Sequence, residues 1–356
     1  MSKNKKLKIL ITGAGAPGII GTINSLRTNY DKRNIFLIGT DVDERSIGKY
    51  LCDQFYKISH SSQIENYLSN MLDICKKHNV DVIIPQNTME LTVLSNSKNR
   101  FESYGVKIMI SDYNTIKLAN NKYKLMEVCK NNNLPVGEFY LISNKSELFE
   151  KANLLGWPEK KIVIKPPKSH GSRGVRIIDE NFDKEQNLFY EKPDNMTTDL
   201  ESLSNIIKEE FPDMILTEYL AGIEYSVDFL IHDKIVVVPR VRSKIRSGIT
   251  FRGHTENNKE IIEITKKLGS ILGLKYCNGF QFKLDENRVP KIIECNPRVQ
   301  GTMIISTLSG ANLIYSGVKV LLGEDIPDFN INWGFEFNRY WGGIGVDENN
   351  KILVLC

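Results

Sequence analysis

Hydrophobic positions in the first third of the chain form short apolar runs separated by longer amphipathic stretches. The short runs have the length of strands, and the stretch at 19–28 has helical spacing. Strands that alternate with helices favour a parallel, doubly wound sheet. We therefore predict a Rossmann-like α/β domain over residues 1–112. Its expected strands lie at 9–12, 35–39, 82–84 and 107–110.

After residue 160 the pattern changes, because apolar strands follow one another with few helices between them. This favours two antiparallel lobes, an α+β arrangement, over a continuation of the parallel sheet. We assign 113–330 to this second domain and expect the lobes to meet near 218–224. A polar stretch at 179–199 is predicted to be an irregular insertion, and 331–356 to form strands that pack back on the body. Further expected elements are strands at 161–165, 175–178, 214–220, 224–231 and 234–241, and helices at 120–132 and 259–272.

The most informative feature is a strand, a turn and a second strand near the C-terminal end. Side chains alternate faces along a strand, so Glu294 and Asn296 share one face. If the polar segment between the strands makes the turn, Gln281 lies across from Glu294 to within about one residue of register. Oxygen ligands of this kind suit Mg²⁺, which keeps several waters and is completed by nucleotide phosphates. The hairpin therefore predicts a cation site; the alternative is an amphipathic hairpin whose polar face is only solvated.

The two faces of the second strand are expected to differ in burial. Ile293 and Cys295 point away from the polar face and are expected to enter apolar packing. Arg298, two residues past Asn296, projects to the polar side, where it can meet phosphate oxygens.

The composition is that of an ordinary globular protein. Of the 356 residues, 41% are hydrophobic and 25% charged, so two or three domains and no large disordered region are expected. A net charge of +4 gives no case for nucleic acid and fits an anionic ligand in a locally basic cleft. Six scattered cysteines without a C-x-x-C pair argue against a zinc site or a disulfide framework and favour a reducing cytoplasm. No run of eighteen apolar residues occurs, so no membrane span is predicted.

A glycine motif follows the first expected strand. Gly13, Gly15 and Gly18 satisfy G-x-G-x-x-G, and Asp41 ends the next strand about where a ribose-binding carboxylate would lie. A Tyr-x-x-x-Lys spacing occurs at 113–117. These features leave an NAD(P)-dependent Rossmann oxidoreductase as an alternative function. The same glycines are needed wherever a strand turns tightly into a helix, so the motif alone does not decide.

Two further segments have the chemistry of a nucleotide site. Lys165 ends a strand just before a Gly/Ser-rich loop at 169–174, whose small residues let backbone N–H groups approach phosphate oxygens. Glu218 and Glu224 flank a short connection, where a strand edge would offer backbone groups to an adenine and Glu224 could accept bonds from ribose hydroxyls. A solvated hairpin turn and exposed glutamates beside a turn are the ordinary alternatives.

A row of cations lies on one extended stretch: Arg240, Arg242, Lys244 and Arg246 alternate along it. Four like charges on one strand face repel one another unless they are solvated or face an anion. The row therefore predicts recognition of a carboxylate or phosphate on a substrate, with a solvated strand face as the alternative.

Taken in order, Lys122, Lys165 with its small-residue loop, 218–224, Gln281 and 294–298 resemble the ATP-grasp superfamily. The likeness is to the single synthetase unit of the carbamoyl-phosphate synthase large subunit and its stand-alone relatives, and it covers nearly the whole chain. By this resemblance the first domain is the Rossmann-like domain that precedes the grasp, and the second supplies its two lobes. At Lys122 the match is less specific, since Asn stands before it where the family usually has Asp.

The resemblance implies a nucleotide-binding role for five residues. Lys122 and Lys165 would hold the phosphates of ATP. Glu218 and Leu220 would lie at the adenine edge, and Glu224 would bind the ribose.

The resemblance also implies a metal site and two catalytic residues. Gln281, Glu294 and Asn296 would hold Mg²⁺ or Mn²⁺. Arg298 would steady the transferred phosphoryl group, and Lys165 would assist it, because phosphoryl transfer depends on positioning and on neutralising oxygen charge.

The reaction that the resemblance implies is ATP-dependent activation of a carboxylate as an acyl phosphate, which an amine or ammonia attacks. Arg240, Arg242 and Arg246 are then expected to contact the carboxylate substrate. The chain resembles one synthetase unit and has no glutaminase candidate, so a free-standing carboxylate–amine ligase is expected. We expect small-molecule partners, no nucleic acid, no membrane and a cytoplasmic location. A homodimer and a catalytically silent ATP-binding module stay open.

Overall fold

The computed structural model describes residues 6–169, 171, 173–191, 196–246, 248–340, 342–349 and 352–355. The chain forms two compact units. The first consists of Met1–Ala119, Tyr225–Phe280 and Cys295–Cys356, and the second of Asn120–Glu224 and Gln281–Glu294. Across the described ranges, no helix is long and apolar enough to cross a membrane.

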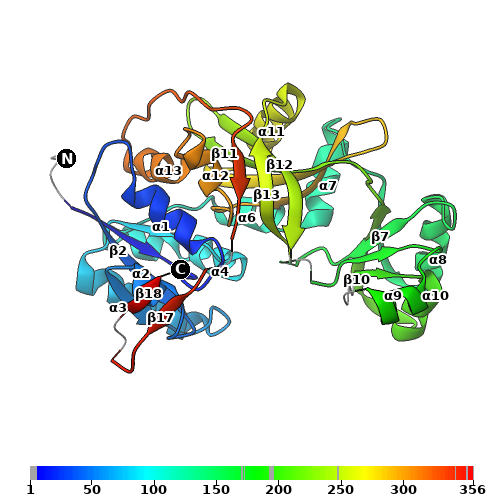
Figure 1. Ribbon diagram of the computed structural model, residues 1–356, viewed down its shortest axis with the longest axis horizontal. Helices are drawn as coiled ribbons and strands as arrows, with labels where there is room; N and C mark the ends of the chain where they lie inside the picture. The colour runs from blue at the N-terminus through cyan, green and yellow to red at the C-terminus, as the bar shows by residue number, and fades with distance from the viewer. Residues whose placement is uncertain are drawn as a thin grey trace. The chain divides into compact units, whose positions relative to one another are not determined.

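The N-terminal part of the first unit is a five-stranded parallel sheet (Figure 1). Its strands are β1 (Leu7–Ile11), β2 (Ile35–Asp41), β3 (Gln54–Lys57), β4 (Val82–Ile84) and β5 (Lys107–Ile108), in the order β3-β2-β1-β4-β5. The helices along this segment are α1 (Ile19–Arg27), α2 (Gly48–Leu51), α3 (Ile64–His78), α4 (Thr88–Asn96), α5 (Lys98–Glu102) and α6 (Tyr113–Ala119).

Apolar clusters cover both faces of this sheet. Ile9 and Ile11 of β1 join a cluster that includes Ile23 of α1, whereas Leu10 joins another that includes Leu68 of α3. The split follows from the alternation of side chains along a strand. Helices on both faces make the sheet doubly wound, and the predicted Rossmann-like arrangement is confirmed.

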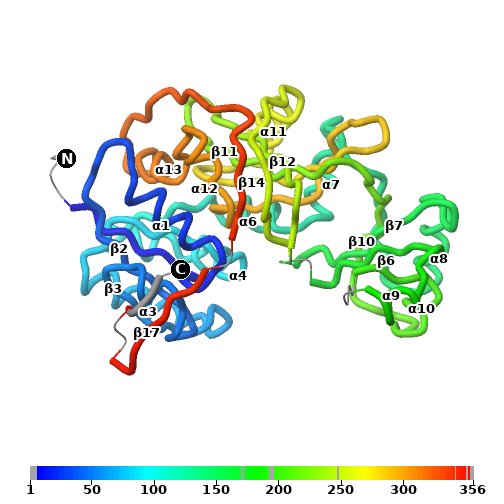
Figure 2. Tube along the Cα trace, viewed as in Figure 1, coloured from blue at the N-terminus to red at the C-terminus, as the bar shows by residue number. Residues whose placement is uncertain are grey.

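The second unit contains a five-stranded sheet in the order β6-β10-β7-β8-β9, antiparallel except between β8 and β9. Its elements are α7 (Lys122–Asn131), β6 (Phe139–Asn144), α8 (Lys145–Leu154), β7 (Ile162–Lys165), β8 (Arg176–Ile178), α9 (Lys184–Tyr190), β9 (Thr197–Thr198), α10 (Leu200–Ile206) and β10 (Glu210–Glu218). Leu148 of α8 and Leu200 of α10 pack with strand residues such as Ile164 in one cluster. Figure 2 shows the chain path through these strands and helices.

A six-stranded sheet has the order β15-β14-β11-β12-β13-β16. Its strands are β11 (Glu224–Ile231), β12 (Val236–Arg246), β13 (Ile249–Thr255), β14 (Tyr276–Leu284), β15 (Pro290–Asn296) and β16 (Glu336–Asn338). The division between the units runs through β14 and β15, so the tip of this hairpin, Gln281–Glu294, belongs to the second unit. The two antiparallel sheets confirm the α+β part of the prediction.

The remaining elements belong to the first unit. They are α11 (Lys259–Ile271), α12 (Ile304–Leu308), α13 (Leu313–Leu322), β17 (Ile344–Val346) and β18 (Ile352–Leu355). β16 pairs with β13 inside the first unit, as the red strand beside the yellow-green one in Figure 1 shows. β17 pairs with β18.

One expectation about local structure was wrong. The stretch 179–199 is not irregular throughout, since it contains α9 and β9. Asp183 caps α9 by accepting a bond from the N–H of Gln186, and this local cap supports a helix in a polar sequence. Residues 192–195 lie outside the described residues.

Candidate functional site

Two lysines and a glutamate come together inside the second unit. Lys122 is the first residue of α7, and its Nζ lies 3.5 Å from Oε2 of Glu294 on β15. The same Nζ donates to the carbonyl O of Ser169 at 3.1 Å and to its Oγ at 3.2 Å. Lys122 and Lys165 are both only 7% exposed. The structure therefore brings Lys122, Lys165 and Glu294 into one electrostatic cluster, although they are far apart in the sequence.

Lys165 is the most perturbed of these groups. Burial, the largest cause, and the nearby charge of Lys122 lower the pKa of its ammonium, Glu294 opposes the shift, and the result is a fall from 10.5 to about 8. A buried cation with too little compensating negative charge is costly, and an anion that binds beside it removes that cost. The cluster thus has an excess of positive charge that suits a phosphate.

The predicted loop after Lys165 is described only in part. Ser169, Gly171, Arg173 and Gly174 are described, whereas His170 and Ser172 lie outside the described residues. Gly171 and Gly174 both have positive φ, at 59° and 74°, so these positions favour glycine. The loop has the small residues and turns expected of a phosphate-approaching segment.

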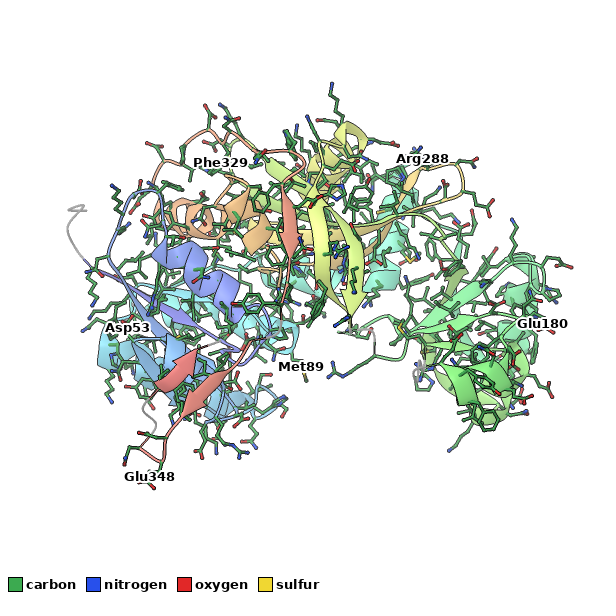
Figure 3. The ribbon with its side chains drawn as sticks, viewed as in Figure 1. Asp53, Met89, Glu180, Arg288, Phe329 and Glu348 are labelled. Atoms are coloured by element: carbon green, nitrogen blue, oxygen red, sulfur yellow. The ribbon has the colours of Figure 1, made fainter. Side chains whose placement is uncertain are left out.

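The hairpin turn that orders β14 and β15 is formed as expected. The N–H of Asp285 donates to the carbonyl of Val289 at 3.0 Å, and Oδ1 of Asp285 accepts from the N–H of Val289 at 2.8 Å. Arg288, labelled in Figure 3, has φ of 64° at the turn and is exposed. Gln281 and Glu294 are both half-buried, which leaves part of each side chain accessible.

Burial along β15 departs from strict alternation. Cys295 is buried, at 7% exposed, as expected, but Ile293 is half-buried and the buried neighbour is Ile292. Ile293 was expected to enter apolar packing, and it is only half-buried. The N–H of Ile292 donates to the carbonyl of Pro135 at 3.5 Å, so this part of β15 lies along a loop of the second unit.

The segment between β10 and β11 is held by backbone contacts. Glu218 donates its N–H to the carbonyl of Glu138, and its Oε1 accepts from the N–H of Glu138 at 3.1 Å. Gly222 donates to the carbonyl of Leu284 at 3.0 Å, and a Cβ on Gly222 would lie 2.6 Å from that oxygen. Glycine is thus required there for the chain to pass against the hairpin.

Leu220 and Glu224, the other two predicted nucleotide residues of this connection, are half-buried. Glu218 is half-buried as well, so all three predicted residues of this connection are partly accessible. Their contacts with adenine and ribose stay predictions.

Asn296 and Arg298 lie in the first unit; Asn296 is the last residue of β15, and Arg298 follows two positions later. The guanidinium of Arg298 donates from Nε to Oγ1 of Thr88 at 3.1 Å and from Nη1 to the carbonyl of Val299 at 2.9 Å. Its Nη2 lies 3.4 Å from Oδ1 of Asn296. Thr88 is the first residue of α4, one position before Met89, which Figure 3 labels. Arg298 is therefore oriented by three contacts from its own unit.

The cations on β12 do not form one continuous row. The register of β12 against β13 shifts on both sides of Lys244, and these irregularities interrupt the alternation that the prediction assumed. Arg240 is fully buried, Arg242 is half-buried and Arg246 is exposed. Pairing is regular from Arg240 to Arg242, so the expectation of one face shared by the whole row was wrong beyond Arg242. Contact of these arginines with a substrate stays a prediction.

Arg242 and Arg246 each have a described contact. Arg242 donates from Nε to Oγ1 of Thr250 at 3.0 Å and from Nη2 to the carbonyl of Gly248. The guanidinium of Arg246 lies 5.1 Å from the ring centroid of Phe251. Arg242 is thus half-buried and Arg246 exposed, whereas Arg240 is fully buried.

Sequence reasoning missed the residues that hold the predicted ones in place. Asp228 forms an ion pair with Arg240, and both side chains are fully buried. The signal was present, because Asp228 stands alone in the apolar strand 225–231 and a buried carboxylate needs a partner. Thr88 and Ser169, which contact Arg298 and Lys122, carry no such signal.

Two family profiles match parts of the chain. Residues 210–337 match a family described as ATP-grasp in the biosynthetic pathway with Ter operon. Residues 9–109 match the PylC-like N-terminal domain.

Curated relatives by sequence are carbamoyl phosphate synthase large chains. The chain is 24% identical over 301 residues to that of Clostridium acetobutylicum, covering 81% of this chain and 25% of the relative. It is 24% identical over 282 residues to that of Clostridium perfringens, covering 74% of this chain and 24% of the relative. The chain therefore spans about a quarter of the length of the relatives that it matches.

Solved structures share the fold at low identity. The ADP complex of an N5-carboxyaminoimidazole ribonucleotide synthetase superposes with a TM-score of 0.69 at 13% identity, covering 94% of this chain and 82% of that one. Biotin carboxylase from Campylobacter jejuni gives 0.68 at 16% identity, covering 93% and 75%. An L-amino acid ligase from Bacillus licheniformis gives 0.63 at 14% identity, covering 90% and 75%.

Proposed function

The chain carries an ATP-grasp domain preceded by a PylC-like N-terminal domain, and from this premise we propose that it is an ATP- and Mg²⁺-dependent ligase. The proposed reaction activates a carboxylate as an acyl phosphate, which an amine or ammonia then attacks. Support comes from the carbamoyl phosphate synthase large chains, the N5-carboxyaminoimidazole ribonucleotide synthetase and the L-amino acid ligase that the chain is similar to.

The observation that carries the proposal is the buried pair of lysines beside Glu294. Lys165 has a pKa lowered to about 8, mainly by burial, and Lys122 lies 3.5 Å from the carboxylate of Glu294. The phosphates of ATP would supply the negative charge that Lys165 lacks, and Lys122 would share them. A structural role alone gives no reason to bury two lysines around one carboxylate.

The donor set on β14 and β15 fits Mg²⁺ or Mn²⁺ delivered with the nucleotide. Gln281 and Asn296 offer amide oxygens, and Glu294 offers the single carboxylate of the set. One carboxylate is a weak ligand set for a free ion, so phosphate oxygens would complete the coordination. When bound, the metal would neutralise charge on the phosphate oxygens during transfer.

The remaining predicted residues take roles around this centre. Glu218 and Leu220 would lie at the adenine edge and Glu224 at the ribose hydroxyls. Arg298, already oriented through Thr88, would stabilise the charge that develops on the transferred phosphoryl group.

The carboxylate of the substrate would be recognised by the half-buried Arg242 and the exposed Arg246. Arg240 was expected with them, but it already holds Asp228 in the interior. The nucleophile would need no enzyme side chain, because an amine attacks an acyl phosphate directly.

A coupled screen tests the proposal. Purified protein with Mg-ATP is mixed with a matrix of carboxylic acids, amino acids and amines, and ADP and phosphate are measured. The ligase predicts release that requires an acid and rises with a matching amine, and that is lost in Glu294→Gln. Release that ignores every acid, or that survives in Glu294→Gln, would contradict it.

A catalytically silent ATP-binding module is the second candidate. The contact between Glu294 and Lys122 favours it, since a carboxylate already paired with an ammonium is a poorer metal ligand. Tight ATP binding without substrate-dependent release across the whole screen would support this candidate.

An NAD(P)-dependent oxidoreductase fits the site less well. The carboxylate of Asp41 already accepts from the N–H of Gly15 at 2.7 Å and from that of Asp43 at 3.0 Å. A Cβ on Gly18 would lie 2.4 Å from Cα of Gly301, so the backbone there is packed against protein. The glycines that would face a pyrophosphate are thus engaged within the chain.

A further inference from the structure

We propose that Arg240 is a positioning residue that fixes the segment 299–303, and through it Arg298, and that the glycine motif serves the same segment. The proposal rests on the proposed function for the importance of Arg298. It gives a role to a buried cation and a glycine motif that nucleotide binding leaves unused.

The guanidinium of Arg240 contacts both a neighbouring strand and the segment 299–303. It forms an ion pair with Asp228, with Nε and Nη2 each 2.7 Å from a carboxylate oxygen. Nη1 donates to Oγ1 of Thr302 at 2.9 Å, and Nη2 also donates to Oε1 of Gln300 at 3.1 Å. The fork of donors thus joins strands β11 and β12 to the chain that follows β15.

Burial determines what the ion pair between Arg240 and Asp228 can contribute. Arg240 and Asp228 are both 0% exposed, so each has lost its hydration entirely. A buried ion pair is often no more stable than an apolar replacement, whereas its directional bonds can select one conformation of what they hold. The contacts of Arg240 with Gln300 and Thr302 are of this directional kind.

Two glycines outside the segment 299–303 pack closely against it. A Cβ on Gly18 would lie 2.4 Å from Cα of Gly301, and a Cβ on Gly279 would lie 2.0 Å from Nε2 of Gln300. Gly18 is the last glycine of the G-x-G-x-x-G motif and the residue before α1. This close approach explains why position 18 is a glycine, and the explanation needs no bound pyrophosphate.

The segment 299–303 is joined directly to Arg298, the residue proposed to stabilise the transferred phosphoryl group. Arg298 directly precedes it, and its Nη1 donates to the carbonyl of Val299, the first residue of the segment. A shift of the segment would therefore move Arg298 away from Thr88. Misplacement by about 1 Å can cost on the order of 100-fold in rate, so a rigid support matters for a residue that stabilises a transition state.

The test compares two substitutions on opposite sides of the ion pair. Thr302→Val removes one of the acceptors that Arg240 has on the segment, leaving Oε1 of Gln300 and the ion pair with Asp228 in place. Ser306→Ala is the matched control, because Oγ of Ser306 donates to Oδ2 of Asp228 at 2.6 Å and does not contact the segment through that bond. Both positions are buried, so a loss of stability alone would affect both variants.

The primary readout needs no substrate. Exchange of the Arg298 Nε proton with solvent is followed by ¹⁵N NMR, and the signal is assigned by its loss in Arg298→Lys. Thr302→Val should accelerate this exchange by about 5-fold or more, because it weakens the support of the hydrogen bond from Nε to Thr88, while Ser306→Ala stays within about 2-fold of wild type. Equal exchange in the two variants would overturn the proposal.

Turnover and nucleotide affinity give the second readout. With an active acid from the screen, Thr302→Val should lower kcat by about 10-fold, the cost of one weakened transition-state contact, and leave the Kd for Mg-ATP within about 2-fold. An equal fall in kcat for Ser306→Ala would assign the network to stability alone. If wild type shows no turnover with any acid, the proposed function fails, and the exchange difference still decides the positioning role.

Gly18→Ala provides an independent check from the glycine side. The added Cβ meets backbone at Gly301, which cannot move as a side-chain tip can, so it should also accelerate Arg298 Nε exchange. Gly21→Ala is its control, since its Cβ would meet the side chain of Ile304 at 2.8 Å instead of the segment. Acceleration in Gly21→Ala but not in Gly18→Ala would contradict the assigned role of the motif.

Discussion

Replacement of Lys165 by methionine should stabilise the protein and weaken its binding of ATP at the same time. Methionine has a similar length and no charge, so it keeps much of the volume and removes the buried ammonium. The pKa of Lys165 is lowered from 10.5 to about 8, chiefly by burial. At 1.36 kcal/mol per pKa unit, this difference is a cost to folding on the order of 3 kcal/mol at neutral pH, and Lys165→Met should recover part of it.

The cost of burying the Lys165 ammonium makes the free energy of unfolding depend on pH. The unfolded chain holds the proton of Lys165 more tightly than the folded protein does, so unfolding takes up a proton between about pH 8 and 10.5. Stability of wild type therefore rises with pH in that window relative to Lys165→Met. The cost is fully present below about pH 8 and is lost above about pH 10.5.

Urea unfolding of both proteins from pH 7 to 10.5, together with calorimetric titration of Mg-ATP at pH 7, measures both effects. Lys168→Met is the matched control, because Lys168 is an exposed lysine three residues further on. Loss of one charged hydrogen bond to phosphate predicts an ATP Kd at least about 10-fold weaker in Lys165→Met and little changed in the control. If Lys165→Met is less stable than wild type at pH 7, or binds Mg-ATP equally well, the account of the two lysines is wrong.

Three further predictions follow from the hairpin and the basic strand. Glu294→Gln and Asn296→Ala should each lower kcat by about 100-fold or more, because they remove metal ligands. Asn296→Ala should leave the melting temperature nearly unchanged, whereas Glu294→Gln should lower it, since it removes the carboxylate beside the buried Lys122. Cys295→Ser should instead lower the free energy of unfolding by about 1 kcal/mol and leave kcat nearly unchanged, since it places a hydroxyl in a buried site; lost activity in folded Cys295→Ser would contradict the site. Arg242→Ala and Arg246→Ala should raise the KM for the acid and keep the ATP Kd within about 3-fold, and equal loss of both affinities would assign them to phosphates.

The parallel sheet and most of the antiparallel strands were predictable because local patterns determine them. β11 was predicted at its observed bounds, since apolar residues from Tyr225 to Ile231 are flanked by polar ones. The strand predicted at 234–241 ends too early for β12, because the last residues of β12 are mostly charged and lack the apolar signal of a strand, although the cations at 240–246 were expected to be extended. Pairing with β13, which is non-local information, keeps that end extended.

The site was predictable by residue type and less so by geometry. Gln281, Glu294 and Asn296 were selected because alternation along a strand is a local rule, and their role as metal ligands stays a prediction. The contact of Lys122 with Glu294 joins a helix start to a distant strand, and no local rule predicts it.

Arg240 shows the same limit more clearly. Its place in a row of cations predicted contact with a substrate anion, whereas the fold pairs it with Asp228, two residues along β11 from its cross-strand partner Ser226. The strand irregularities at Lys244 then separate Arg246 from Arg240 and Arg242, whose pairing with β13 is still regular.

The most direct measurement of the central claim is calorimetric titration of the intact protein with Mg-ATP, Mg-ADP, NAD⁺ and NADPH, with Glu294→Gln and Lys165→Met alongside wild type. The account predicts binding of both adenine nucleotides in the presence of Mg²⁺, weaker binding in both variants, and no binding of the nicotinamide cofactors. Binding of NAD⁺ or NADPH alone, or adenine nucleotide binding that neither variant weakens, would contradict it.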